Sequence, residues 1–137
     1  MRILETEAQI AEGVDVLVKI EPRFQVVIDA HGLPPLRRSA EGLEGLLRIV
    51  TDQLISLKAG EAIWQRVERA LHPFDAVTIA GKRQATLMGL GLSGAKARSF
   101  KAIARAAAEG TLDFAALHRV PDEEVTARLT AISGIGR

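Results

Sequence analysis

Apolar residues recur at helical spacing along most of this chain. The clearest stripe, with apolar residues at positions i, i+3, i+4 and i+7, is Leu43, Leu46, Leu47 and Val50. A second helix of the same period is predicted to start after Ser56, as its N-cap, and to run to Leu71. Tyr is absent and Phe occurs four times, so the aromatic residues that favour strands are scarce. The pattern predicts an all-α protein.

Proline, glycine and capping residues predict where the other helices begin and end. We expect a helix over residues 5–20, interrupted or bent near Gly13, and a short helix over residues 23–30 that ends at Gly32. Pro73 should end the helix that precedes it, and a loop with short apolar pieces should follow. Further helices are predicted over residues 95–109, after a capping Ser93, and from Asp113 and Pro121-Asp122.

Composition narrows the class of protein. The chain has 137 residues, 47% of them hydrophobic, which suits one ordinary domain with a core. The absence of cysteine excludes disulfides, thiolate zinc sites and a cysteine nucleophile. No apolar run approaches the roughly 20 residues of a membrane helix, and the first residues lack a signal-peptide core. We expect a cytoplasmic protein with no membrane partner.

Charge is distributed unevenly, although the formal net charge is only +1. Residues 76–108 contain six Lys or Arg and no acidic residue, whereas residues 109–128 contain five acidic residues and two Arg. Such a basic block suits a polyanion, because phosphate neutralisation drives nucleic-acid binding. A solvated helix face explains the block equally well from charge alone.

The chain finishes with an amphipathic run and a tight glycine turn, Gly134-Ile135-Gly136. Glycines permit positive φ and leave backbone N–H groups open to an anion. Such a turn normally joins two helices, and here we expect only the first of them. Another glycine pattern, Gly89-x-Gly91-x-x-Gly94, matches a dinucleotide fingerprint by letter, but no strand precedes it. We reject that interpretation.

Four segments carry a pattern that is more specific than composition. In chain order they are LLRIVTDQLIS (46–56), AIWQRV (62–67), GLGLSGAKA (89–97) and LTAISGIG (129–136). Together they resemble the helix-hairpin-helix DNA glycosylases of the 3-methyladenine DNA glycosylase II type. The resemblance implies an all-α, glycosylase-like helical bundle that ends in the first helix and hairpin of a helix-hairpin-helix motif. It divides the chain into residues 1–40 (N-terminal helices and connector), 41–120 (central helical domain) and 121–137 (incomplete helix-hairpin-helix).

The resemblance implies base-excision repair. The enzyme would hydrolyse the N-glycosidic bond of alkylated bases in double-stranded DNA after flipping the nucleotide, and in bacteria it would lie with the nucleoid. Leu54 occupies the place of the family's wedge, which fills the vacated stack, and Gln53 would touch the base left behind or brace the loop. Packing of Leu54 inside the protein is the structural alternative. Lys96 lies in the segment similar to the family's turn and helix start, and would also contact DNA.

The hairpin would hold the DNA backbone. The resemblance implies phosphate contacts from the residues of the turn and no organic cofactor. In relatives the same turn can bind a monovalent cation through main-chain carbonyls, which by position would be those of Thr130, Ile132 and Ile135. The residues expected to contact phosphate are Gly134, Ile135, Gly136 and Arg137.

The family's catalytic carboxylate is an Asp about one helix beyond the hairpin, so it is expected beyond Arg137 and no catalytic residue is assigned within this chain. Asp52 departs from the family pattern and would place negative charge near the DNA. A non-catalytic helical DNA-binding or interaction module is the alternative function. We also expect bare apolar surface, with two possible outcomes: self-association, or an Arg137 terminus left by a trypsin-like protease that acted on a longer protein. The candidate residues of that surface are Leu43, Leu46, Leu47, Val50, Val125, Leu129 and Ile132.

Overall fold

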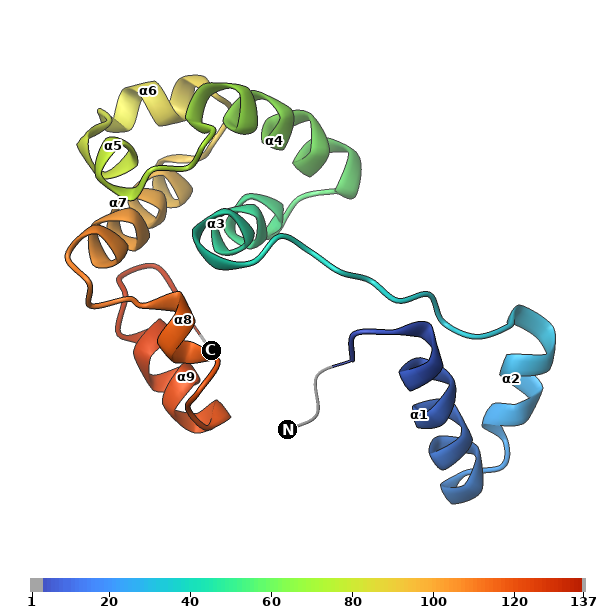
Figure 1. The fold of residues 1–137 in the computed structure, drawn as a ribbon. Helices are drawn as coiled ribbons and strands as arrows, with labels where there is room; N and C mark the ends of the chain where they lie inside the picture. Colours follow the sequence, from blue (N-terminus) through green and yellow to red (C-terminus); the bar gives the residue numbers. More distant parts are fainter. Residues whose placement is uncertain (1–3, 137) are drawn as a thin grey trace. The chain divides into compact units, whose positions relative to one another are not determined.

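The described part of the chain is built from helices and the segments that join them. The structure is a computed structural model that describes residues 4–136, and within that range it contains helices and no strand, so the predicted all-α class is confirmed. None of these helices is long and apolar enough to cross a membrane. The chain divides into two compact units, Met1–Ser39 and Ala40–Arg137 (Figure 1). The segment 121–137, predicted as a separate part, falls in the second unit.

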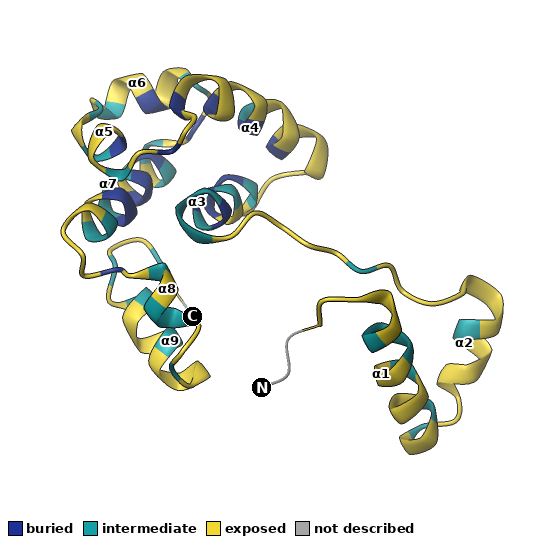
Figure 2. Ribbon diagram, viewed as in Figure 1, coloured by how far each residue is buried: buried dark blue, intermediate teal, exposed yellow. Residues whose placement is uncertain are grey.

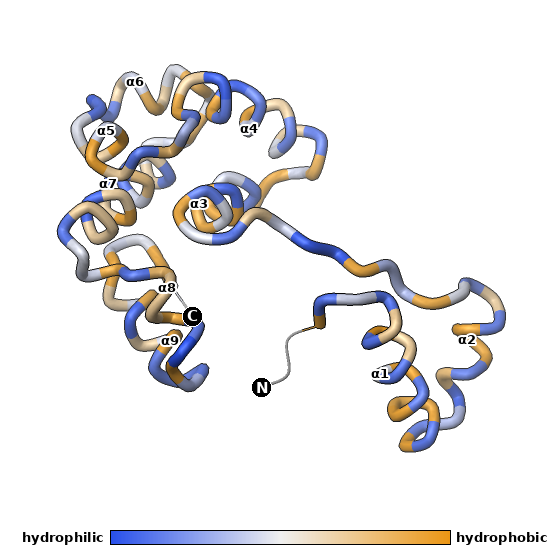
Figure 3. Tube along the Cα trace, viewed as in Figure 1, coloured by the Kyte–Doolittle hydropathy of each residue, from blue (hydrophilic) through white to orange (hydrophobic). Residues whose placement is uncertain are grey.

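The described part of the first unit, residues 4–39, is a pair of helices without buried residues. α1 (Glu7–Ile20) begins with a capping box in which Thr6 and Gln9 exchange hydrogen bonds, and α2 (Phe24–His31) ends at Gly32. The expected interruption of α1 at Gly13 is wrong, because the helix runs unbroken through it. The apolar side chains of both helices are exposed or only partly buried, as Figures 2 and 3 show together.

The second unit is centred on α7. This helix packs against α3, α5 and α6, and α3 packs in turn against α4. Phe100 and Ile103, both on α7, are fully buried in the core that these contacts enclose. The helices of this unit are α3 (Gly42–Asp52), α4 (Leu57–Leu71), α5 (Ala76–Gly81), α6 (Gln84–Gly89), α7 (Gly94–Ala108), α8 (Phe114–Leu117) and α9 (Asp122–Thr130).

Two capping serines are placed as predicted. Ser56 accepts a hydrogen bond from the N–H of Ala59, and Ser93 accepts one from the N–H of Lys96, so they cap α4 and α7. The loop predicted after Pro73 is wrong in part, because α5 and α6 form there. Each of these helices has six residues and one fully buried side chain. A helix of that length is too short to show a periodic apolar stripe in the sequence.

The predicted apolar stripe of α3 faces the hydrophobic core of the second unit. Leu47 and Val50 are buried, and Leu129 and Ile132 are partly buried against the same core. The expectation that this stripe is bare is wrong, because α7 lies against α3. The buried members of the stripe therefore offer no surface for self-association.

Candidate nucleic-acid interface

A short loop between α3 and α4 projects an apolar side chain into solvent. We call residues 53–56 the wedge loop. Leu54 is 103% exposed, so the alternative in which it packs inside is wrong, and its φ of +58° lies in the left-handed region. A non-glycine residue there costs about 1–2 kcal/mol. The surrounding structure must therefore stabilise this conformation.

An arginine holds the α4 side of the wedge loop. Arg48 donates from Nε to Asp52 Oδ2 at 2.8 Å and from Nη2 to Glu61 Oε2 at 2.9 Å, and its guanidinium lies 5.4 Å from the centroid of the Trp64 ring. The negative charge of Asp52, expected near the DNA, is thus paired. A Cβ at Gly60 would overlap Asp52 Oδ1, so glycine permits this close approach of α4 to Asp52.

The ion pairs of Arg48 predict acid sensitivity. Hydrogen bonding to Arg48 holds the pKa of Glu61 below its ordinary value of 4.5. A lowered folded pKa contributes stability above the unfolded pKa, and that stability is lost as pH falls through the folded value. We expect the free energy of unfolding to fall as the pH drops below about 4.5. Urea titrations across pH 3–6 should show a smaller fall for Glu61→Gln; equal falls would contradict the pairing.

Lys96 reaches from α7 to the end of α3, just before the wedge loop. Its Nζ donates to the carbonyl oxygen of Thr51 at 2.7 Å, and the contact is partly buried. Arg98, two residues further along α7, is exposed, and no ion pair is recorded for it among the described residues. The two neighbouring cations of α7 therefore have different surroundings.

The hairpin packs against α7 through a close backbone contact. Gly134 has a φ of +94°, and a Cβ at this position would overlap Ser99 Oγ. Ile132 and Ile135 pack against the core, and the N–H of Ile135 donates to the carbonyl of Ile132 at 3.0 Å. Gly136 is exposed. Arg137 lies outside the described residues.

The carbonyls expected to hold a monovalent cation belong to this turn. That of Ile132 already accepts the Ile135 N–H, which leaves one lone pair for an ion. No group of three or more His, Asp or Glu side chains suited to a metal occurs among residues 4–136. Main-chain carbonyls are a different kind of ligand, so the cation held by Thr130, Ile132 and Ile135 stays a prediction.

One open depression of about 350 Å³ brings most of these features together. It joins the wedge loop, the first two turns of α7 and the start of the hairpin, and it includes four of the predicted site residues: Gln53, Leu54, Lys96 and Gly134. Ser99, whose small side chain lets the hairpin approach, was not predicted from the sequence. The spacing of Ser99 and Gly134 gives no signal of their contact.

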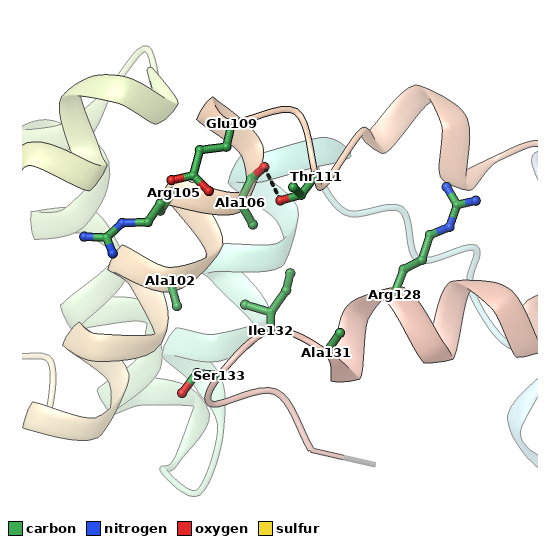
Figure 4. A pocket seen from close by; sticks show the side chains of 9 residues that line it. All are labelled: Ala102, Arg105, Ala106, Glu109, Thr111, Arg128, Ala131, Ile132 and Ser133. Atoms are coloured by element: carbon green, nitrogen blue, oxygen red, sulfur yellow. Dashed lines mark hydrogen bonds between the residues drawn. The ribbon is translucent and has the colours of Figure 1, made fainter.

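A second depression, of about 480 Å³, lies beside the carboxyl half of α7 and the end of α9 (Figure 4). Ile132 points into it, whereas the guanidinium of Arg105 is turned away from Ile132. Arg128 is paired with Glu124 at 2.8 Å. Of the two arginines that line this depression, Arg128 is paired and Arg105 is turned away from Ile132, so we assign the depression no ligand.

Two solved structures of DNA glycosylases are similar to this chain. The sequence matches no protein-family model and no curated protein. A crystal structure of a DNA-3-methyladenine glycosidase from Bacillus halodurans is similar to it with a TM-score of 0.73 and 27% identity, over 99% of this chain and 62% of that one. A 3-methyladenine DNA glycosylase from Schizosaccharomyces pombe, in complex with abasic DNA, has a TM-score of 0.75 and 30% identity, over 82% of this chain and 58% of that one.

This chain thus spans about three fifths of the length of each of these structures. Both are 3-methyladenine DNA glycosylases by name, the type that the four sequence segments resemble. The described residues therefore have the fold of the 3-methyladenine DNA glycosylases, and the resemblance of the sequence to the helix-hairpin-helix DNA glycosylase superfamily is confirmed.

Proposed function

We propose that this chain is part of a DNA glycosylase of base-excision repair. In that enzyme it binds double-stranded DNA and holds an alkylated nucleotide that has been flipped out of the duplex. The observation that carries the proposal is the wedge loop, which presents a fully exposed leucine in a left-handed backbone conformation. A free protein gains nothing from exposing Leu54 in this way. A site where DNA bases separate gives that side chain an apolar partner.

The energetics suit a wedge. Extruding a nucleotide costs a few kcal/mol of stacking and pairing, and burying a leucine side chain returns about 1.5–3 kcal/mol. Leu54 can therefore offset a large part of the cost by filling the gap in the stack. Gln53, beside it in the same depression, presents an amide donor and acceptor to the base that remains.

Backbone contacts would come from α7 and the hairpin. Arg98 and Lys101 stand three residues apart, so they share a face of α7. Gly134, in the same depression as Arg98, presents a backbone without a side chain in the way. Contacts of this kind fix the DNA in register without reading its sequence.

A duplex with a central abasic-site analogue tests the proposal, and its choice follows the DNA bound to the S. pombe relative. We expect the 137-residue chain to bind this duplex more tightly than the matched intact duplex, because the gap receives Leu54 without the cost of unpairing. 2-Aminopurine beside the gap should become more fluorescent as it unstacks. Equal affinity for both duplexes would contradict the proposal and favour a non-catalytic DNA-binding or interaction module.

Salt dependence tests the phosphate contacts. Each contact adds about 0.9 to the slope of log K against log salt concentration. Arg98→Ala with Lys101→Ala should lower the affinity for both duplexes and reduce the slope by about 2, as measured by fluorescence anisotropy. An unchanged slope would mean that this face of α7 is only solvated.

The bond-breaking step needs a carboxylate near the sugar, where it stabilises an oxocarbenium-like transition state. No acidic side chain lines the depression that contains Leu54 and Gly134, and Asp52 is paired with Arg48. We therefore expect the 137-residue chain to release no base from a duplex that contains 3-methyladenine. Base release measured by chromatography would require an acidic residue within this chain to take that role.

A further inference from the structure

The end of α3 lacks a capping hydrogen bond of its own. In the other helices of residues 4–136, the C-cap residue donates its backbone N–H to a carbonyl of the last turn, whereas no such bond is recorded for Gln53 at the end of α3. The last carbonyls of a helix carry partial negative charge and need donors. A donor from another part of the chain can therefore stabilise the end of α3, just before the chain enters the wedge loop.

Lys96 supplies this donor across 45 residues of sequence. The acceptor, the Thr51 carbonyl, belongs to a fully buried residue three positions before Leu54. A charged donor strengthens the hydrogen bond, and the ammonium group also complements the negative end of α3. The contact thus stabilises the point from which the wedge loop departs.

The position of Lys96 in its own helix is unfavourable. It stands in the first turn of α7, after the capping Ser93, where the helix macrodipole disfavours a cation. It also shares a stripe, at i, i+3 and i+7, with Ser99 and Ile103, which are both buried. A lysine that breaks the local rule for helix ends is therefore compensated by its contact with the end of α3.

We infer that Lys96 is a positioning residue: it fixes the end of α3 and hence the direction of the Leu54 side chain, and its charge acts on the Thr51 carbonyl in place of a DNA phosphate. Arg48 connects the same end of α3 to α4, because it pairs with both Asp52 and Glu61. The role of the loop in DNA binding rests on the proposed function. The contact itself acts in the free protein, which allows the two to be tested separately.

Three variants of the 137-residue chain separate positioning from phosphate binding. Lys96→Met keeps an unbranched apolar side chain and removes the donor, Lys96→Arg keeps a donor, and Arg98→Ala removes a neighbouring exposed cation. In the free chain, ¹⁵N relaxation at Gln53 and Leu54 reports the order of the loop. With DNA, the slope of log K against log salt concentration reports phosphate contacts.

We expect Lys96→Met to lower the order parameters of the wedge loop and to reduce the preference for the abasic duplex roughly tenfold, with an unchanged salt slope. Lys96→Arg should restore both, and Arg98→Ala should leave the loop ordered and lower the slope by about 1. If Lys96→Met leaves the loop ordered, or lowers the slope as Arg98→Ala does, the inference is wrong. If the parent chain has no preference for the abasic duplex, the proposed function fails, while the loop order of the free variants still decides the role of Lys96.

Discussion

Replacing Leu54 with glycine should abolish the preference for abasic DNA without destabilising the free chain. The side chain is fully exposed, so its removal loses no core contact. Its φ of +58° suits glycine, and relief of about 1–2 kcal/mol of backbone strain offsets the greater entropy that glycine gives the unfolded chain, about 0.5–1 kcal/mol. The free energy of unfolding, measured in urea, should therefore stay the same or rise slightly.

The loss in DNA binding should be large in comparison. Without the leucine side chain, about 1.5–3 kcal/mol of burial in the stack disappears, which corresponds to roughly a 10- to 150-fold loss of preference for the abasic duplex over the intact one. Leu57→Ala is the matched control, because Leu57 is 87% exposed at the start of α4 and has ordinary helical geometry. It should leave the preference unchanged.

The stability of Leu54→Gly and its DNA binding thus respond differently, which is expected where strain serves function. A variant that unfolds more easily would show that Leu54 contributes to stability. A variant that keeps the preference for the abasic gap would show that another side chain fills the gap. Leu54→Ala separates the two effects further, since it removes the wedge and retains the left-handed strain.

Local pattern predicted much of the second unit. The stripe of α3 is a strong periodic signal, and Ser56 and Ser93 are capping residues that act over three positions. Those features depend on neighbours within one or two turns, so the sequence displays them directly. α5 and α6 were missed because helices of six residues contain fewer than two full turns and give no readable period.

The candidate site was predicted only in outline. The position of the wedge was predicted from the family resemblance. Neither the left-handed conformation of Leu54 nor its full exposure could be predicted from the amino-acid sequence. The contact of Lys96 with Thr51 joins residues 45 positions apart in the sequence. The contact of Gly134 with Ser99 also joins residues that are far apart in the sequence. Both depend on how α7 packs between α3 and the hairpin, which is a tertiary property.

Helix α1 illustrates a different limit. Its apolar residues stand at mixed spacing, and the structure buries none of them, so that Val16 and Ile20 remain exposed. The sequence predicted the helix from its composition, which is a local property, whereas the capping box of Thr6 and Gln9 became apparent only in the structure. It could not predict which face is covered, because no single stripe exists.

Gly134→Ala should detach the hairpin from α7. The φ of +94° costs an alanine about 1–2 kcal/mol, and its Cβ would overlap Ser99 Oγ, which adds about 1–3 kcal/mol of overpacking. Because Gly134 lines the same depression as Leu54, displacement of the hairpin should also weaken binding to both intact and abasic duplexes.

Hydrogen exchange at the amide of Ile135, which donates to Ile132, measures the detachment directly and should become faster in Gly134→Ala. Gly110→Ala is the matched control: its φ is +75° and nothing lies within 4 Å of a Cβ there, so it carries the strain without the overlap. Adding Ser99→Gly to Gly134→Ala should recover the part that comes from the overlap. If Gly134→Ala costs no more stability than Gly110→Ala and binds DNA normally, the close contact between the hairpin and α7 does not position the hairpin for DNA.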